Sequence, residues 1–396
     1  MKLADRITQL NESQTLAMAK LSRELKEQGL DIINLTLGEP DFVTPDYIRN
    51  AAKKAIDDGF TFYPPVSGFA DLRKAIAEKF KRENNLDYKP EQIVVSTGAK
   101  QSIANVVMSL INEGDEVIIP APYWVSYSQI VQVAGGVPVY IDAQVESDFK
   151  ITADLIEKAI TPKTKLFIYS SPCNPTGSVY TREELESFAL VFKKHDNIII
   201  MSDEIYEHIN FIGQHESIAQ FEYIKDRVVI VNGVSKAYAM TGWRLGYIAA
   251  PLEIAKACDK IQGQFTSGAS SISQKAALAA VSSDAKLIES MKTAFRTRRD
   301  LMLKHLGAIP GIKLNNPGGA FYVFPDVSSY FGKKYNDTVV NNAEALSMFL
   351  LTDANVSSVT GEAFGNANCI RFSYATSDHL LVEACSRIKE SLSKLQ

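Results

Sequence analysis

The stretch that decides the fold spans residues 230–247 and reads Ile-Val-Asn-Gly-Val-Ser-Lys-Ala-Tyr-Ala-Met-Thr-Gly-Trp-Arg-Leu-Gly-Tyr. It overlaps a β-branched run at 228–231 that is too short for a helix and is typical of a buried strand. The loop after this run carries Ser235 and Lys236, and Arg244 precedes a second strand-like run. Ligands of open α/β sheets bind outside the carboxyl ends of the strands. A lone lysine is usually a solvated surface group, but small and aromatic residues flank Lys236, so we expect a binding site here.

The composition is ordinary for a soluble protein of enzyme size: of 396 residues, 46% are hydrophobic and 22% are charged. The length suggests two or three domains, or one large α/β domain with a satellite. A net charge of -4 with interspersed signs gives no basic surface, so we expect neither nucleic acid nor membrane as a partner. No apolar run approaches the ~20 residues of a membrane helix, and residues 1–6 do not lead into a signal-peptide core.

The cysteines are scattered and form neither CxxC pairs nor a disulfide framework. This usage predicts a reducing, cytoplasmic location. They are Cys173, Cys258, Cys369 and Cys385.

Strand-like runs alternate with helical patterns through the middle of the chain, and Thr181 with Glu184 forms a capping box before one of the helices. The weakest run contains Pro138, which is tolerated only near the start of a strand or on an edge. We expect an α/β fold with a doubly wound, seven-stranded, mainly parallel sheet. The runs are 93–96, 116–119, 137–141, 165–169, 197–201, 227–231 and 245–249.

Polar, aromatic and charged residues follow five of these seven runs. Each group alone could be a turn, a cap or a solvated loop. Because the carboxyl ends of parallel strands meet at one edge of a sheet, five such groups are better explained by a binding site. The groups are Thr97-Gly98-Ala99-Lys100, Pro120-Ala121-Pro122-Tyr123-Trp124, Asn174-Pro175-Thr176-Gly177, Asp203-Glu204-Ile205-Tyr206 and Ser235-Lys236.

The two ends of the chain depart from this alternation. Ser13 or Thr15 would cap a helix at 13–29, and Thr44 would cap another helix whose first residue is Pro45. We expect a large domain at 45–285 and a smaller α/β domain made of 1–44 and 286–396, with a long linking helix at about 284–307. The other expected elements are strands at 32–37, 318–324 and 369–373 and helices at 70–83, 344–352 and 378–395.

The residues at the predicted site suit a phosphorylated aromatic aldehyde with a basic ring nitrogen. The helix start at Gly98 and the guanidinium of Arg244 would hold a phosphate. Trp124 offers a face for stacking, a buried Asp203 would keep a ring nitrogen protonated, and Lys236 could form an imine with an aldehyde. Pyridoxal phosphate combines these features. No dinucleotide or nucleoside triphosphate motif and no metal-ligand spacing is present.

On these residues the chain resembles a class I, fold-type I pyridoxal-phosphate aminotransferase over nearly its whole length, and most of all the bacterial aspartate aminotransferase Ib branch. The order and spacing of the motifs make a chance match very unlikely. The motifs are Gly38-Glu39-Pro40-Asp41-Phe42, the run from Tyr63 to Gly68, Tyr123-Trp124, Asn174-Pro175-Thr176-Gly177, Asp203-Glu204-Ile205-Tyr206, Ser235-Lys236 with Arg244, and Arg371-Phe372-Ser373.

The resemblance implies a role for each cofactor-binding residue. Lys236 would carry the pyridoxal 5'-phosphate covalently and then act as general base. Asp203 would pair with the ring nitrogen, Asn174 and Tyr206 would hydrogen-bond the ring oxygen, and Trp124 would stack on the ring. The phosphate would be surrounded by Gly98, Ala99, Lys100, Ser235 and Arg244. Tyr63 of the neighbouring subunit would also reach the phosphate, which implies a homodimer with shared active sites.

The resemblance also implies the reaction. Arg371 would bind the α-carboxylate of the substrate, with Gly38, Trp124 and Asn174 beside it, and the peptide bond before Pro175 is expected to be cis. The substrates would be amino acids and 2-oxo acids.

The presence of Lys100 with the hydroxyls of Ser13 and Thr15 favours aspartate and glutamate, so L-aspartate and 2-oxoglutarate would give oxaloacetate and L-glutamate by a ping-pong mechanism through pyridoxamine phosphate. The partner-subunit arginine of another branch has no match here. Gly233 departs from the pattern, since some relatives carry a phosphate-binding serine there, which would shift that task to Arg244 and the helix N-terminus.

Two other functions compete with this interpretation. An aromatic amino-acid or prephenate aminotransferase could use the same scaffold, because a fold does not fix a function. A regulator could retain the fold as an amino-acid sensor, but we would then expect an appended DNA-binding segment, for which the residues before the first motif leave little room. A silent cofactor-binding module is disfavoured because Lys236, Asp203 and Arg371 are all present.

Overall fold

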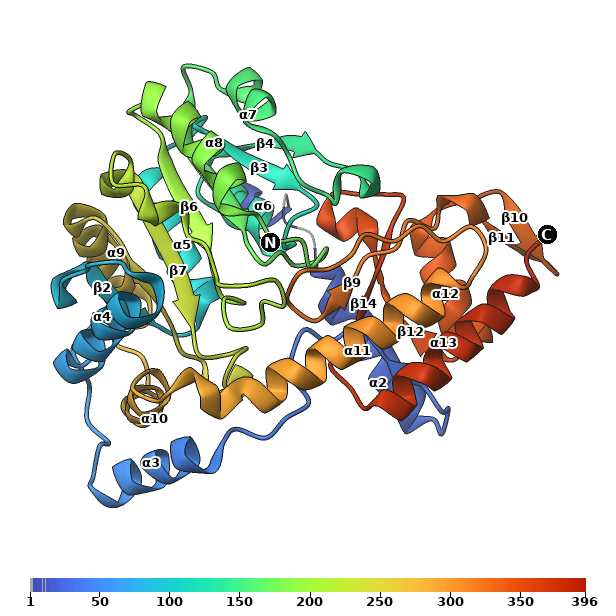
Figure 1. Cartoon of the computed structure of the whole chain (residues 1–396), viewed down its shortest axis with the longest axis horizontal. Coiled ribbons are helices and arrows are strands. Elements are labelled where there is room, and N and C mark those ends of the chain that lie inside the picture. The colour runs from blue at the N-terminus through green and yellow to red at the C-terminus, as the bar shows by residue number, and fades with distance from the viewer. Residues whose placement is uncertain (1–2, 9, 11) are drawn as a thin grey trace.

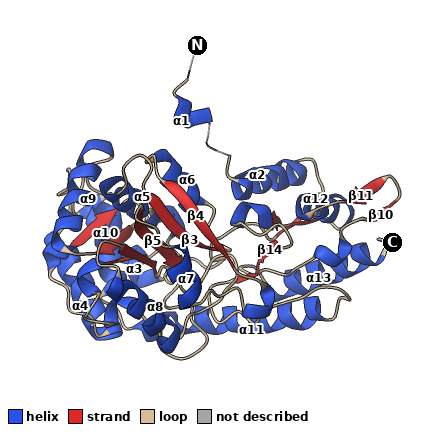
Figure 2. Cartoon of the chain, turned by 90° about the horizontal axis from the view of Figure 1, so that it is seen from above, coloured by secondary structure: helices blue, strands red, loops and turns tan. Residues whose placement is uncertain are grey.

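The computed structural model describes residues 3–8, 10 and 12–396, so Met1, Lys2, Gln9 and Asn11 of the predicted small domain lie outside the described residues. Figure 1 shows a sheet covered by helices, a smaller α/β part beside it, and the long helix α11 (Glu289–Gly307) running from one part to the other. In Figure 2 the short helix α1 (Asp5–Thr8) stands away from both parts.

The larger part is built on one seven-stranded sheet with the strand order β2-β8-β7-β6-β5-β3-β4. Neighbouring strands are parallel except that β8 is antiparallel to both β2 and β7. The predicted seven-stranded, mainly parallel sheet is therefore confirmed. Pro138 lies on the edge strand β4, where the missing N–H is tolerated. The strands are β2 (Ile93–Ser96), β3 (Glu116–Ala121), β4 (Val137–Asp142), β5 (Thr164–Ser170), β6 (Ile199–Asp203), β7 (Val228–Gly233) and β8 (Gly246–Ala249).

All the strands except the edge strand β4 bury most residues of both faces, which explains why they read as continuous apolar runs. Successive side chains of a strand point to opposite faces: Val228 and Ile230 join the core on one side, whereas Val229 and Val231 join the core on the other. Helices α3, α4, α7, α8 and α10 contribute to the first core, and α5, α6 and α9 to the second.

The helices of this part are α3 (Asp46–Asp57), α4 (Ala70–Asn84), α5 (Ala99–Leu110), α6 (Ser126–Val133), α7 (Ala153–Ala159), α8 (Arg182–Lys194), α9 (Leu252–Phe265) and α10 (Ser271–Val281). Among the described residues, none of the helices is both long and apolar enough to cross a membrane.

A further hydrophobic core lies in the smaller part, around residues such as Phe321, Tyr322 and Leu350, and it includes Tyr206 and Phe211 of the larger part. The division into domains stays a prediction. The strands of the smaller part are short. For example, β1 and β9 each contain only two residues of the longer strands expected from the sequence. The elements are α2 (Gln14–Glu27), β1 (Ile33–Asn34), β9 (Tyr322–Val323), β10 (Lys333–Tyr335), β11 (Thr338–Val340), α12 (Ala343–Asp353), β12 (Val356–Ser357), β13 (Val359–Thr360), β14 (Ile370–Ser373) and α13 (Asp378–Ser393).

The predicted capping box is present, since Thr181 accepts from the backbone of Glu184 and the side chain of Glu184 accepts from the backbone of Thr181. The predicted cap at Thr44 was wrong. Pro45 holds the N-cap position of α3, and the Thr44 hydroxyl instead donates to the carbonyl of Ala239 at 2.6 Å and accepts from Trp243 at 3.0 Å. Thr44 thus ties the chain to the loop after Lys236, a long-range contact that cap preference cannot reveal.

A glycine on β8 lets the start of helix α5 approach the sheet. A Cβ added to Gly246 would lie 2.2 Å from the backbone nitrogen of Ala99, where no side chain fits. Because Ala99 is the first residue of α5, this contact fixes where the amino end of the helix lies at the edge of the sheet.

We predict that Gly246→Ala destabilises the protein by about 1–3 kcal/mol, as overpacking does. Gly263→Ala is the matched control, since its Cβ would lie 3.9 Å from Val66 in ordinary contact. Within helix α9 this change should be neutral or stabilising by about 0.5–1 kcal/mol. Urea unfolding of the cofactor-free protein measures both. Equal effects of the two substitutions would contradict the close approach.

Candidate active site

A cavity of about 350 Å³ lies at the carboxyl edge of the sheet, against the smaller part. It brings together thirteen of the fifteen residues predicted to form the site, from elements that are far apart in the sequence. Those that line it are Ser13, Thr15, Gly38, Ala99, Lys100, Trp124, Asn174, Asp203, Tyr206, Ser235, Lys236, Arg244 and Arg371.

One end of the cavity is a group of donors around the start of α5. Gly98 is the N-cap residue with φ +84°, and a Cβ on it would lie 2.5 Å from Nη2 of Arg244. The first N–H groups of a helix have no intrahelical acceptor. Arg244 is fixed there because its Nη1 donates to the carbonyl of Thr241 at 2.8 Å. These donors suit a phosphate.

Lys100 adds a second cation next to this end. Burial lowers the pKa of its amine, and the nearby charge of Arg244 lowers it further. Its Nζ lies 5.0 Å from the centre of a Trp124 ring. The structure records no carboxylate paired with Lys100 among the described residues, so this amine is available to an anionic ligand.

Asp203, the last residue of β6, also lines the cavity. Tyr127 donates to its Oδ2 at 2.6 Å, and the backbone N–H of Ile205 donates to its Oδ1 at 3.2 Å. Burial raises the pKa of Asp203 to about 6, and the Tyr127 hydrogen bond opposes this rise. A buried carboxylate of this kind gains stability from a cationic partner, such as a protonated ring nitrogen.

Lys236 lines the same cavity from the loop that follows β7. Its Nζ donates to the carbonyl of Gly38 at 2.5 Å. Burial and, to a smaller extent, the charge of Arg371 lower the pKa of Lys236 to about 8. At pH 7 roughly a tenth of the amine is therefore in the unprotonated form, which attacks an aldehyde.

Arg371 is a buried cation, only 2% exposed. Its Nη1 donates to Oδ1 of Asn174 at 2.9 Å and its Nη2 to the carbonyl of Thr36 at 2.6 Å, whereas Nε has no partner. Both partners are neutral, and no carboxylate pairs with this guanidinium within the described part of the chain. A buried cation without an anion favours a carboxylate ligand. The peptide bond between Asn174 and Pro175 is cis, as predicted.

The sequence analysis missed two tyrosines of the cavity. Tyr127 binds Asp203, and the hydroxyl of Tyr322 lies 2.8 Å from that of Tyr206. Tyr127 lies in the first turn of α6, and its ring meets that of Trp124, which precedes the helix, edge-on at 5.4 Å. Tyr322 belongs to a run that we interpreted only as a strand, and nothing local marks it.

Two predicted residues do not line the cavity. Gly98 lies directly behind it, against Arg244. Tyr63 is 98% exposed and its neighbour Phe62 is 83% exposed. Gly233, where some relatives carry a serine, has no room for a side chain, because its Cβ would lie 2.9 Å from the Cα of Gly246.

Comparison with known proteins agrees with this geometry. The sequence profile of the family described as aminotransferase class I and II matches residues 30–388. The chain is 48% identical to an aspartate/prephenate aminotransferase of Cereibacter sphaeroides, over 98% of each sequence. It superposes on the crystal structure of an aspartate aminotransferase from Rhizobium meliloti with a TM-score of 0.96 at 41% identity over 100% of each chain.

A Thermus thermophilus aspartate aminotransferase solved with maleate gives a TM-score of 0.93 at 40% identity, over 99% of this chain and 100% of that one. The chain belongs to the class I and II aminotransferases. It is therefore a transferase with the fold of that family, as we expected from the resemblance.

Aminotransferases of this family depend on pyridoxal 5'-phosphate, and the residues around the cavity fit it. The start of α5 and the guanidinium of Arg244 lie close together, since a Cβ on Gly98 would lie 2.5 Å from Nη2 of Arg244, so both can donate to one phosphate. The buried amine of Lys236 and the buried carboxylate of Asp203 supply groups for the aldehyde and the ring nitrogen.

We predict that Asp203→Asn stabilises the cofactor-free aminotransferase at alkaline pH. Because the pKa of Asp203 is raised in the folded state, its contribution favours folding below about pH 4 and is lost as the pH rises through about 6. The variant escapes that loss, so it should be more stable than the wild type by roughly 2–3 kcal/mol at pH 8 and about equal near pH 4.

Urea unfolding at the two pH values measures the difference. Asp226→Asn, at an exposed carboxylate, is the matched control and should show no such gain. If Asp203→Asn is no more stable than the wild type at pH 8, ionisation of the buried Asp203 carboxylate does not cost folding free energy, and our interpretation is wrong.

Proposed function

We propose that this aminotransferase transfers the amino group of L-aspartate to 2-oxoglutarate, giving oxaloacetate and L-glutamate. The observation that carries the proposal is a pair of cations, Arg371 and Lys100, that both line the cavity and have no carboxylate partner among the described residues. Two such cations suit a substrate with two carboxylates. The hydroxyls of Ser13 and Thr15 line the same cavity and can donate to the second carboxylate.

The named relatives support this assignment. Those from Rhizobium meliloti and Thermus thermophilus are both called aspartate aminotransferases, and the second was solved with maleate, a dicarboxylate.

The side chains divide the work of the reaction. Pyridoxal phosphate, when bound, supplies an aldehyde for the amino group and a ring that accepts electrons. Arg371 fixes the α-carboxylate and so sets which bond at the substrate Cα faces Lys236. Nζ of Lys236 removes the proton from that carbon, and Asp203 keeps the ring nitrogen protonated. Tyr206, whose hydroxyl is held by Tyr322, and Asn174 donate to the ring oxygen.

A second candidate is prephenate transamination, which the name of the Cereibacter sphaeroides relative includes. Prephenate also carries a second carboxylate, so Lys100 suits it as well. Its ring needs an apolar wall, and Leu16, Leu37 and Ile103 line this cavity. The aromatic amino acids lack the second carboxylate and are therefore less well matched to Lys100.

We also propose a cytoplasmic homodimer with shared active sites. Tyr63 and Phe62 are almost fully exposed and lie outside their own cavity, and α1 stands off the chain with Ile7 half exposed (Figure 2). Apolar groups of this kind favour burial against a second copy. All four cysteines are free, which supports a reducing compartment.

We also propose the division into a large domain at 45–285 and a smaller domain made of 1–44 and 286–396.

We predict that Lys100→Ala lowers kcat/KM for aspartate at least about tenfold relative to that for phenylalanine, because only the dicarboxylate uses the second cation. Arg371→Ala should lower kcat/KM for both substrates together, because both carry the α-carboxylate. Steady-state kinetics with aspartate, phenylalanine and prephenate measure these ratios. If Lys100→Ala impairs aspartate and phenylalanine equally, the assignment to dicarboxylates is wrong.

We further predict that two inactive variants complement each other. In a mixed dimer of Tyr63→Ala and Lys236→Ala subunits, one site has both intact residues if Tyr63 is contributed by the partner. Random mixing should then restore about a quarter of wild-type activity. Separate refolding of each variant is the control. A mixture that stays inactive, or an active monomer in light scattering, would refute the shared site.

A further inference from the structure

A cluster of buried charges lies behind the active site, on the far side of the segment that carries Asp203 and Tyr206. Asp203, Ile205 and Tyr206 line the active-site cavity. Glu207 and His208 instead line a second cavity of about 230 Å³. Residues 203–208, which we call the 203–208 segment, therefore separate the two cavities and present charged groups to both.

The centre of the cluster is Lys79 on helix α4, which is only 1% exposed. Its ammonium contacts Oε1 of Glu207 and donates to Oδ1 of Asn84 at 3.0 Å. Asn84 in turn donates to Oε2 of Glu207 at 3.0 Å. Although burial opposes its ionisation, Lys79 and the nearby histidines hold the pKa of Glu207 well below its usual range. Lys79 and Asn84 thus bind the two carboxylate oxygens of Glu207, one each.

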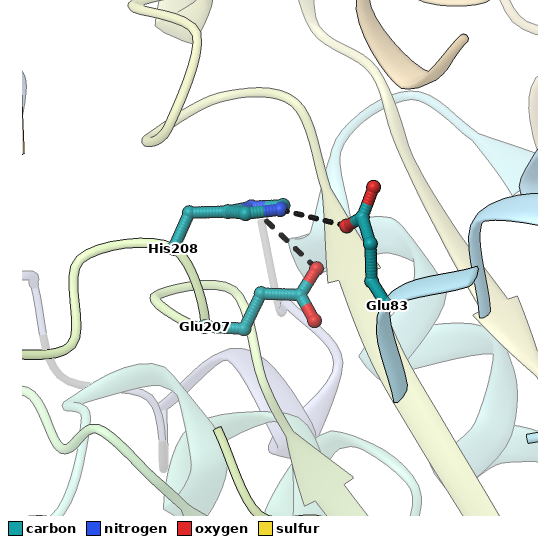
Figure 3. Close-up of side chains that lie close together, drawn as sticks. All are labelled: Glu83, Glu207 and His208. Atoms are coloured by element: carbon teal, nitrogen blue, oxygen red, sulfur yellow. Dashed lines mark hydrogen bonds and ion pairs between the residues drawn. The ribbon is translucent and has the colours of Figure 1, made fainter. Parts of the chain in front are cut away.

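A second layer surrounds this pair. Figure 3 shows His208 facing two carboxylates, with Nε2 at 2.9 Å from Glu83 and Nδ1 at 3.6 Å from Glu207. Glu83 comes from the same helix as Lys79 and lies 3.6 Å from its ammonium. Elsewhere in the cluster, the hydroxyl of Ser217 donates to Oε1 of Glu204 at 2.6 Å, and Nε2 of His215 lies 3.0 Å from Oε2 of Glu204.

The geometry favours a fixed ion pair over a metal site. The ammonium of Lys79 already lies among the carboxylates, where a divalent cation would have to displace it. The ligand atoms of Glu83, Glu207 and His208 lie within 4.8 Å of one another, but His208 directs its two ring nitrogens at two different carboxylates instead of sharing one centre with them. Transition metals need such a shared centre.

A buried ion pair is rarely better for stability than apolar side chains of the same size, but it can specify one arrangement of the backbone. Here the pair joins helix α4 to the 203–208 segment. The segment starts at Asp203, the last residue of β6, and the N–H of Glu204 donates to the carbonyl of Val231 on β7. Beyond Glu204 its backbone has only the turn hydrogen bonds from Glu207 to Glu204 and from Ile209 to Tyr206. Fixing Glu207 therefore fixes the backbone next to Tyr206.

We propose that Lys79 and Glu207 are positioning residues that hold Tyr206, and with it the turn that follows Asp203, against the ring of the cofactor. The inference rests on the proposed function, because it needs pyridoxal phosphate in the cavity. It assigns the pair to the ring end alone. The phosphate end is built by Gly98, Lys100 and Arg244, none of which touches the cluster.

The test compares two ligands of the cofactor-free protein, pyridoxal phosphate and inorganic phosphate, by calorimetry. Lys79→Met and Glu207→Gln should each raise the Kd of pyridoxal phosphate about tenfold or more, as loss of an outer-shell partner does for a bound metal. The Kd of inorganic phosphate should stay within about twofold of the wild type. The double variant should bind no more weakly than the weaker single variant, because both changes break one interaction.

Asp71→Asn is the matched control. It also removes a carboxylate of α4 from an ion pair, with Lys275 at 2.6 Å, but does not touch the 203–208 segment. It should leave both dissociation constants unchanged. If Lys79→Met does not fold, Glu83→Gln and His208→Gln test the same cluster from its rim, where these side chains are less buried.

Three outcomes would overturn the inference. In the first, the variants bind pyridoxal phosphate as tightly as the wild type. In the second, pyridoxal phosphate and inorganic phosphate weaken equally, which is the mark of general loosening. In the third, the wild-type protein fails to bind pyridoxal phosphate at all, which would contradict the proposed function as well.

Discussion

The active site depends on ionisable side chains whose charges are removed from water and only partly balanced by neighbouring groups of the protein. The pKa of Lys236 is lowered by burial and by the nearby charge of Arg371, Asp203 ionises against the cost of burial, and Arg371 donates only to neutral acceptors. Such an arrangement costs folding free energy. A ligand that brings an aldehyde, a ring nitrogen, a phosphate and a carboxylate relieves each of these costs. The site is therefore selective because the protein alone leaves it unsatisfied.

The fold bears this cost by placing the groups on rigid elements. Asp203 ends a central strand, Lys236 follows the neighbouring strand, and the start of α5 is pressed against β8 where Gly246 lacks a side chain. Arg371 comes from β14 of the smaller part and reaches Asn174 of the larger part. The substrate carboxylate would thus bind where the two parts meet. The charged cluster around Lys79 holds the 203–208 segment, which lines the same cavity from the larger part.

Much of this could be predicted from the sequence, because the information is local. Seven apolar runs gave the sheet, and the residues after them gave the edge at which ligands bind. Tyr127 was missed, because its partner Asp203 is distant in the sequence. The contacts of Tyr322 with Tyr206, of Thr44 with Ala239 and of Lys79 with Glu207 could not be found, because each joins residues that are more than a hundred positions apart. The lengths of the strands in the smaller part were overestimated, because most residues of those apolar runs pack in a hydrophobic core without pairing in a sheet.

The central claim is that the cavity holds pyridoxal phosphate on Lys236 and accepts the amino group of aspartate. The most direct measurement is the absorption spectrum of the pure protein before and after addition of L-aspartate. Our account predicts a near-visible band from the cofactor on Lys236 that converts to the spectrum of the amine form when aspartate is added. A bound chromophore that does not respond to aspartate would contradict the proposed substrate. No chromophore, even after incubation with pyridoxal phosphate, would contradict the account as a whole.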